Sequence, residues 1–245
     1  MIVRLSAGQQ DLFLSVLRQH PFLGSRIRSA YICYGIRSPL AGFYFVGQSA
    51  AVAVLGNSAL VAGEAEPQEL GLFLQLQGVN NVKTTGMQVE GYSPIPQYLM
   101  ERKAGSTDGT QNKILPVGCD LHRKPDLWQL AHSGLLPEAE SYYGDSLRRQ
   151  NKGLADIAAV WCNGEYVSTA GLYSIQPEGG YITAVATKPS FQKQGLAGSL
   201  LSYFAEKYQH KNLWLLCRPQ LKPYYQRFGF TTDAPVQELV LNTVK

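Results

Sequence analysis

A long stretch without charge, residues 38–63, constrains the fold of this chain most strongly. A continuous apolar run of about 18 residues or more would predict a membrane-spanning helix. Here Gly47-Gln48-Ser49 and Gly56-Asn57-Ser58 interrupt the stretch. The breaks leave three short runs rich in β-forming residues, which predict a buried β-meander in a soluble, cytoplasmic protein. These runs are Gly42–Val46, Ala50–Leu55 and Ala59–Val61.

Composition and charge exclude several classes of protein. The chain has 245 residues, of which 45% are hydrophobic and 16% charged, so it can bury a core and is not disordered. The length suits one large domain or two small ones. Residues 1–180 carry 14 basic and 15 acidic side chains, a net of −1, whereas residues 181–245 carry 8 and 3, a net of +5. Such a local excess suits a compact anionic ligand, and a nucleic-acid-binding protein would show a denser basic face.

The cysteines and the N-terminus exclude other features. Cys33, Cys119, Cys162 and Cys217 form no C-x-x-C pair, and no matching His-x-x-x-His accompanies them. We therefore expect neither a disulfide framework nor a zinc site, and no bound metal. The segment Met1–Ser6 turns polar without an apolar region behind it, so we expect no signal peptide.

The N-terminal half predicts helices on either side of the strands. Apolar spacing favours a helix over Gln9–Arg18 that Pro21 ends, and Tyr31–Ile36 is predicted as a strand. Pro67–Leu76 has proline in the first helical turn, its favoured position. From Gln77 to Pro125 the signals are weak, and the turn-forming segment Gly105–Thr110 is the best candidate for a domain boundary or mobile loop. We accordingly divide the chain into an N-terminal α/β lobe, 1–110, and a second domain, 111–245.

The C-terminal half has clearer patterns. Two β-rich runs flank Asn163-Gly164, the strongest short hairpin signal because both residues tolerate positive φ. The predicted helices are Asp126–Leu136, Ala139–Gln150, Gly195–His210 and Pro223–Phe228. The predicted strands are Ile157–Cys162, Tyr166–Ile175, Gly180–Ala186, Leu213–Cys217 and Glu238–Leu241.

One strand, loop and helix, residues 181–198, carries the most chemical information. A loop that enters a helix through small residues such as Gly195 and Gly198 leaves backbone N–H groups open to a ligand. The helix dipole and the amides of residues 194–198 would hold a pyrophosphate, with Lys188 and Lys193 adding positive charge. The alternative is that the glycines only start a helix close to a sheet.

Two motifs favour the ligand-binding interpretation. Gln192, Gly195 and Ala197, after a strand and Pro189, match the Arg/Gln-x-x-Gly-x-Gly/Ala pattern. Downstream, residues 223–230 read Pro-Tyr-Tyr-Gln-Arg-Phe-Gly-Phe and look like a Phe-Tyr-Glu-Lys-Leu-Gly-Phe signature. Together, in this order, they resemble the GNAT superfamily of acyl-CoA-dependent N-acetyltransferases, and the resemblance covers about residues 140–245.

The resemblance implies an α+β fold with a mostly antiparallel, splayed sheet flanked by helices, in which acyl-CoA lies beside the strand at 180–186. It further implies transfer of acetyl from acetyl-CoA to a primary amine, by direct attack in a ternary complex; we expect a small-molecule acceptor. Tyr225 falls on the position that protonates the CoA thiolate in many members, with Tyr224 as the second choice; the alternative is a core aromatic beneath Phe228 and Phe230. The expected CoA contacts are Val185, Ala186, Thr187, Gln192, Lys193, Gln194, Gly195, Leu196, Ala197 and Gly198.

The sequence also departs from the family pattern. Many members place a glutamate general base on or beside the first-motif strand, and Ile182–Lys188 contains no carboxylate. The base is therefore unassigned, and the missing group also fits a non-catalytic acyl-CoA-binding or sensor protein. Four carboxylates lie in this half without any pattern that singles one out: Asp145, Asp156, Glu165 and Glu178.

The N-terminal half carries no catalytic signature. Its strands followed by a helix are similar to a second, degenerate acetyltransferase-like lobe of the kind found in tandem GNAT proteins. No residue motif supports that similarity, and we expect this half to form one wall of the acceptor site.

Overall fold

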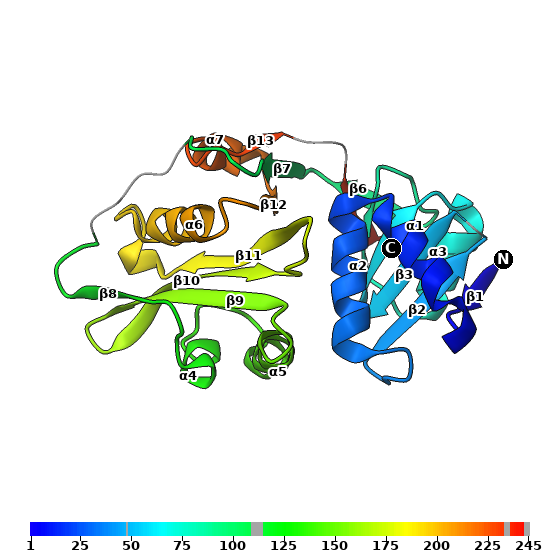
Figure 1. The fold of residues 1–245 in the computed structure, drawn as a ribbon, viewed down its shortest axis with the longest axis horizontal. Helices are drawn as coiled ribbons and strands as arrows, with labels where there is room; N and C mark the ends of the chain where they lie inside the picture. The colour runs from blue at the N-terminus through cyan, green and yellow to red at the C-terminus, as the bar shows by residue number, and fades with distance from the viewer. Residues whose placement is uncertain (48, 109–114, 233–235, 243–245) are drawn as a thin grey trace. The chain divides into compact units, whose positions relative to one another are not determined.

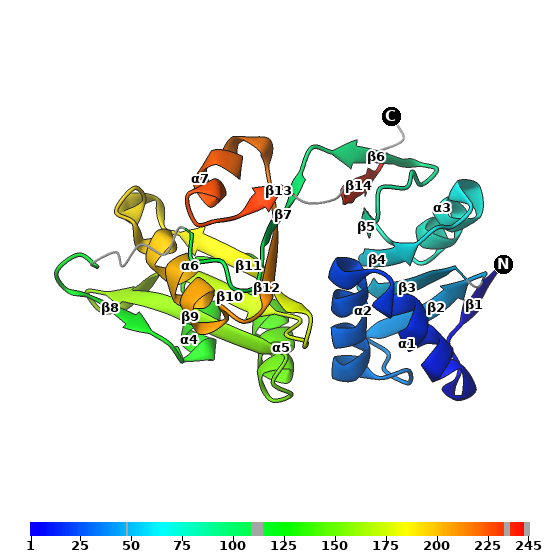
Figure 2. The same ribbon diagram turned by 45° about the horizontal axis from the view of Figure 1, so that its top comes forward.

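A computed structural model describes residues 1–47, 49–108, 115–232 and 236–242. It contains two compact units (Figures 1 and 2). Residues 1–99, 216–219 and the described part of 233–245 form the N-terminal lobe, and residues 100–215 and 220–232 form the C-terminal lobe. Within the described residues, we find no helix with the length and apolar character needed to span a membrane.

The N-terminal lobe is a seven-stranded sheet with three helices. The uncharged runs form neighbouring antiparallel strands, as the meander pattern predicts. The strands are β1 (Ile2–Arg4), β2 (Ala41–Val46), β3 (Ala50–Leu55), β4 (Ser58–Gly63), β5 (Asn81–Thr84), β6 (Tyr92–Ile95) and β14 (Gln237–Leu241). The helices are α1 (Gln10–Arg18), α2 (Pro21–Tyr34) and α3 (Pro67–Leu76).

Alternating side chains of β2 show how helices cover both faces of this sheet. Phe43 and Phe45 pack edge to face against Phe13 of α1, with ring centroids 6.2 and 5.4 Å apart. Tyr44, between them, packs against Phe73 of α3 with ring centroids 4.9 Å apart. Because successive side chains of a strand point to opposite faces, α1 and α3 lie on opposite sides of the sheet.

The C-terminal lobe is also built on a seven-stranded sheet. Figure 1 shows α6 on one face of it and α4 and α5 on the other. The strands are β7 (Tyr98–Arg102), β8 (Cys119–His122), β9 (Ala155–Cys162), β10 (Glu165–Tyr173), β11 (Gly179–Thr187), β12 (Asn212–Cys217) and β13 (Thr231–Thr232). The helices are α4 (Leu127–Ala131), α5 (Ala139–Gln150), α6 (Leu196–Lys207) and α7 (Lys222–Gln226).

The two sheets have the same topology. The order is β1-β2-β3-β4-β5-β14-β6 in the N-terminal lobe and β8-β9-β10-β11-β12-β7-β13 in the C-terminal lobe. In each sheet the fourth and fifth strands in this order pair in parallel. The sixth place is filled by a strand that follows the other lobe in the sequence: β14 follows β13, and β7 follows β6. The predicted mixed, mostly antiparallel α+β fold with a second lobe is thus confirmed, and the chain returns to the N-terminal lobe to add β14 to its sheet.

Two sequence-based expectations need correction: the strand at Tyr31–Ile36 and the place of the closing strand. Tyr31–Ile36 is not a strand, because α2 runs from Pro21 to Tyr34; proline opens this helix at its first turn and does not merely end the previous one. The weak region Gln77–Pro125 contains four short strands, β5 to β8. The predicted closing strand exists as β14 but pairs with β5 and β6 of the N-terminal lobe. The predicted loop at Gly105–Thr110 lies partly outside the described residues.

The expectation of no disulfide is wrong. Cys119 and Cys162 are joined by a disulfide and are directly opposed in the register of β8 and β9, with their Cα atoms 4.3 Å apart. They are 43 residues apart in the sequence, so no local spacing motif could reveal the pairing. The bond ties the edge strand β8 to the sheet.

Candidate active site

A bulge in β11 creates the site. Thr169 of β10 pairs with Ala186 and Gly171 pairs with Thr183, so three steps along β11 match two along β10. The extra residue lies at Ala184, whose φ of 54° is in the left-handed region. An inserted residue of this kind bends a strand and interrupts its ladder.

The parallel pairing of β11 with β12 stops just before this bulge. In the part of the chain that the structure describes, the register runs from Gly179 and Asn212 to Tyr181 and Trp214 and is not continued. Both strands extend further, to Thr187 and Cys217. From Ile182 onward β11 therefore leaves its ladder with β12. Such a separation is what the splayed sheet implied by the resemblance requires.

Hydrogen bonds to β10 and within the loop hold the loop from β11 to α6 in place. The Ser168 and Thr187 hydroxyls lie 2.8 Å apart, and the Lys188 amide donates to the Val167 carbonyl at 2.9 Å. The Gln192 side-chain amide donates to the Thr187 carbonyl at 3.2 Å. These bonds fix the conformation of the loop that leads into α6.

Helix α6 begins without a side-chain cap. Gly195 precedes it with φ 85° and ψ 0°, a left-handed conformation that glycine adopts without a steric penalty, and this N-cap residue offers no side chain to accept from the first amides. The first N–H groups of a helix have no partner within the helix and carry partial positive charge. The end of α6 can therefore receive an anion.

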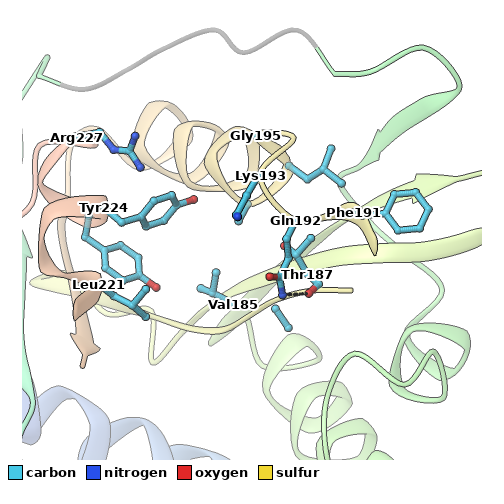
Figure 3. A pocket seen from close by; sticks show the side chains of 13 residues that line it. Val185, Thr187, Phe191, Gln192, Lys193, Gly195, Leu221, Tyr224 and Arg227 are labelled. Carbon is cyan, nitrogen blue, oxygen red and sulfur yellow. Dashed lines mark hydrogen bonds between the residues drawn. The ribbon is translucent and has the colours of Figure 1, made fainter. Parts of the chain in front are cut away.

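A cavity of about 610 Å³ lies at this helix end (Figure 3). Its size suits a cofactor-sized ligand. Its lining contains two cations, Lys193 and Arg227, and no carboxylate among the described residues. Figure 3 shows both cations and Tyr224 around the cavity, with Val185 and Thr187 below them. The lining residues are Val185, Ala186, Thr187, Phe191, Gln192, Lys193, Gly195, Leu196, Ala197, Leu221, Tyr224, Tyr225 and Arg227.

The structure brings most of the predicted site residues together. The expected CoA contacts and Tyr225 all line the cavity except Gln194, whose side chain donates to the Ser190 carbonyl at 3.3 Å, and Gly198, which is buried within α6. Lys188, predicted to add positive charge there, does not line the cavity and pairs with Glu165. Sequence reasoning missed Phe191, Leu221 and Arg227. Arg227 lies inside the second motif, and a positive charge two residues after Tyr225 could have indicated a contact with an anionic ligand. Nothing in the sequence marks Phe191 or Leu221 as a site residue.

The two tyrosines of α7 both line the cavity and also pack against other rings. Tyr225 is 7% exposed, and its ring centroid lies 6.2 Å from that of Phe230. The Arg227 guanidinium lies over the Tyr224 ring, 5.2 Å from its centroid. Burial raises the pKa of Tyr224, and the charge of Arg227 opposes that rise. Tyr225 thus combines the core-aromatic position with access to the cavity.

The sequence left four carboxylates without an assigned role: Asp145, Asp156, Glu165 and Glu178. None of them lines the cavity. Glu165 forms an ion pair with Lys188 at 2.5 Å, and both oxygens of Asp145 accept from Arg149. Asp156, only 15% exposed, pairs with Lys207 at 2.7 Å. Glu165, Asp145 and Asp156 thus have structural roles in ion pairs. In the described residues no three His, Cys, Asp or Glu side chains gather as a possible metal site.

Comparison with known proteins identifies the domain. Residues 124–230 match the model of the acetyltransferase (GNAT) family, whereas no curated protein matches the sequence. A tandem GNAT protein from the clavulanic acid biosynthesis pathway is similar over 100% of this chain and 99% of its own, with a TM-score of 0.62 and 11% identity. A Drosophila protein is similar over 98% and 97%, with a TM-score of 0.64 and 13% identity. A GCN5-related N-acetyltransferase from Kribbella flavida covers 90% and 96%, with a TM-score of 0.56 and 15% identity.

At these identities the neighbours show the fold, and they extend the likeness over both lobes. The range that matches the family model contains both sequence motifs, whose residues meet in the cavity. Residues 124–230 of this chain therefore form the part that matches the acetyltransferase (GNAT) family, within a two-lobed fold like that of the neighbours.

Proposed function

We propose that the C-terminal lobe transfers an acetyl group from acetyl-CoA to a primary amine of a small molecule, by direct attack in a ternary complex. The observation that carries the proposal is the cavity itself. It joins Gln192, Gly195 and Ala197 of the first motif to Tyr225 of the second, and both motifs come from a family that uses acyl-CoA.

The residues present fit the donor. Its phosphates are anionic, and they would meet the uncapped amides of α6 with Lys193 and Arg227 beside them. Val185, Ala186 and Thr187 offer backbone groups on the open edge of β11 to the amide-containing arm. When bound, acetyl-CoA supplies the activated acyl group, and this chain orients it.

Tyr225 is the residue we assign to the departing thiolate. A phenol can donate a proton to a thiolate as the carbon–sulfur bond breaks. Its buried position at the cavity wall keeps water away from that step. Tyr224 lies next to it, and its ring is covered by Arg227.

The test is turnover of a panel of primary amines with acetyl-CoA, comparing Tyr225→Phe with the matched variant Tyr224→Phe. Loss of a general acid costs roughly 100-fold or more. We expect that fall in kcat for Tyr225→Phe, an unchanged Kd for CoA, and a smaller effect for Tyr224→Phe. Equal activity of wild type and Tyr225→Phe would refute the assignment.

One observation favours a second candidate, a non-catalytic acyl-CoA sensor: the cavity lining has no carboxylate among the described residues. Tight acetyl-CoA binding without turnover of any amine in the panel would select that function.

A further inference from the structure

A buried serine lies directly behind the strand that lines the cavity. Ser168 of β10 is opposite Thr187 of β11, and the next pair along the two strands is Thr169 and Ala186. Ser168 is fully buried and does not itself line the cavity. A buried hydroxyl costs free energy unless it is hydrogen-bonded. The partners of this hydroxyl therefore indicate its role.

Two contacts join the Ser168 side chain to β11. Its hydroxyl donates to the Ala186 carbonyl at 3.0 Å. The hydroxyl oxygens of Ser168 and Thr187 lie 2.8 Å apart. Ala186 and Thr187 both line the cavity. One side chain behind the cavity wall thus holds two neighbouring residues of that wall.

Ser168 lies between two irregularities of the sheet. The register of β10 with β9 shifts between Tyr166 and Ser168, and its register with β11 shifts between Thr169 and Gly171. Irregularities of this kind interrupt the backbone ladder. The Ser168 hydroxyl supplies a side-chain hydrogen bond to the β11 backbone at this point. It therefore helps to fix the end of β11 where regular pairing alone does not.

The number of protons determines the direction of both contacts. A hydroxyl has one proton to donate and two acceptor positions. A carbonyl oxygen can only accept, so the Ser168 proton is used in the hydrogen bond to Ala186. The Thr187 hydroxyl must then be the donor in its contact with Ser168. The Thr187 oxygen has no second proton to offer a ligand, so toward a ligand it can only accept.

The neighbouring groups leave this oxygen as an acceptor at the cavity wall. The Gln192 side-chain amide donates to the Thr187 carbonyl (Figure 3), and the Ser168 hydroxyl donates to the Ala186 carbonyl. Within the described chain, no N–H or O–H group donates to the Thr187 hydroxyl oxygen. A ligand with an N–H group can fill this position, whereas a ligand group that only accepts cannot.

We infer that the Thr187 hydroxyl oxygen accepts a hydrogen bond from an amide N–H of the acyl-CoA arm, and that Ser168 is the positioning residue that orients it. This assignment rests on the proposed function. It adds a side-chain contact to the backbone contacts proposed for residues 185–187. It also makes the wall selective for an arm that carries amide groups, because another arm leaves the acceptor without a partner.

The first experiment measures the Kd of acetyl-CoA for the full chain by isothermal titration calorimetry. Thr187→Val keeps the shape of the side chain and removes the hydroxyl, so we expect Kd to rise roughly 5- to 10-fold. Thr187→Ser keeps the hydroxyl and should recover most of the affinity. Ser168→Ala should cause a smaller loss. In the double variant the losses of Ser168→Ala and Thr187→Val should not multiply, because both act on the same hydrogen bond.

Ser146→Ala is the matched control for the buried serine. Ser146 is also buried, and its hydroxyl lies 2.6 Å from that of Tyr173, but neither residue lines the cavity. Both Ser→Ala variants should lower the Tm, because each removes a buried hydrogen bond. Only Ser168→Ala should raise the Kd of acetyl-CoA. Equal Kd values for the wild type and both variants would show that Ser168 is merely structural.

A change in the ligand tests the hydrogen bond itself. The probes are analogues of acetyl-CoA in which one amide N–H of the arm is replaced by an ester oxygen. One analogue should bind the wild type roughly 5- to 10-fold more weakly than acetyl-CoA does, and Thr187→Val should weaken its binding little further. If Thr187→Val weakens every analogue as much as it weakens acetyl-CoA, the assignment of Thr187 is wrong. A wild type that does not bind acetyl-CoA would overturn the proposed function itself.

Discussion

In the N-terminal lobe β4 is followed by α3, and in the C-terminal lobe β11 is followed by α6 at the same place in the topology. The two strands differ in how they pair with their parallel neighbours. In the N-terminal lobe β4 pairs with β5 at four successive positions, from Ser58 to Val61, before α3 follows. In the C-terminal lobe β11 pairs with β12 at three positions and then bulges at Ala184. A single inserted residue thus distinguishes β11 from the regular strand β4 at this point of the topology.

The helix ends differ even more, because their electrostatics are opposite. The Glu66 carboxylate accepts from the amides of Gln68 and Glu69 at the start of α3, at 3.1 and 2.5 Å. Glu64 and Glu69 add charge of the same sign nearby. At the start of α6 the N-cap residue is Gly195, which has no side chain to cap the helix, and Lys193 lines the cavity. The N-terminal lobe thus keeps the fold but fills its own anion site with a carboxylate.

The largest effect we predict tests this difference directly. Ala197 lines the cavity in the first turn of α6, and Ala197→Glu places there the charge that α3 already carries. We expect one acetyl-CoA per chain for the wild type, and a loss of affinity of at least 100-fold for Ala197→Glu, by isothermal titration calorimetry.

Ala197→Gln is the matched control, because it adds the same volume without charge and should lose less affinity. Two bound donors per chain would break the comparison, since the N-terminal lobe would then bind despite Glu66. If Ala197→Glu and Ala197→Gln lose the same affinity for acetyl-CoA, the volume of the added side chain, and not its charge, would account for the loss.

The second prediction concerns the disulfide that ties β8 to β9 in the C-terminal lobe. Closing a loop of 43 residues restricts the unfolded chain by up to about 4 kcal/mol in the chain-entropy model. Cys162→Ser should therefore lower the stability of the C-terminal lobe by a few kcal/mol and leave that of the N-terminal lobe unchanged, as measured by hydrogen exchange in each lobe.

A reducing agent should reproduce the loss in the wild type and have no further effect on Cys162→Ser. Equal loss of protection in both lobes would show that they unfold as one unit and that the disulfide is not local in its effect.

How much the sequence could predict follows from the distance between interacting residues. The walls of the cavity were predictable, because Gln192, Gly195 and Ala197 act within one loop and one helical turn. The three runs of the meander were predictable for the same reason. The place of β7 beside β12 was not, because placing Glu101 beside Trp214 requires contacts across more than 100 residues, and the sequence of β7 does not reveal its partner. The disulfide could not be predicted either, because Cys119 and Cys162 are 43 residues apart in the sequence.

The third prediction is a pair of small changes with opposite signs. Ala184 adopts φ 54°, a conformation that costs an L-residue about 1–2 kcal/mol and glycine little. Ala184→Gly should raise the stability of the C-terminal lobe by roughly 0.5 kcal/mol, after the entropy that glycine adds to the unfolded chain. Ala62→Gly, in the regular strand β4, should lower the stability of the N-terminal lobe by about 1 kcal/mol. Denaturant titration measures both, and destabilisation by both variants would argue against a bulge at Ala184.

The smallest effect concerns the cap that closes α3. The amides of Glu69 and Gln68 lower the pKa of Glu66 from its ordinary value of 4.5. A folded-state pKa below the unfolded one means that the ionised carboxylate stabilises the fold above pH 4.5, and that this contribution is lost as the pH falls through the lowered value. Glu66→Gln keeps an acceptor oxygen but cannot ionise, so its Tm should be slightly below that of the wild type at pH 6, and the difference should shrink as the pH falls below 4.5. The difference should also shrink in 1 M salt, because the Glu66 side chain is exposed to solvent. A Tm difference that stays constant from pH 6 to pH 3 would mean that the carboxylate does not cap α3, and that something other than a built-in charge distinguishes this helix end from the start of α6.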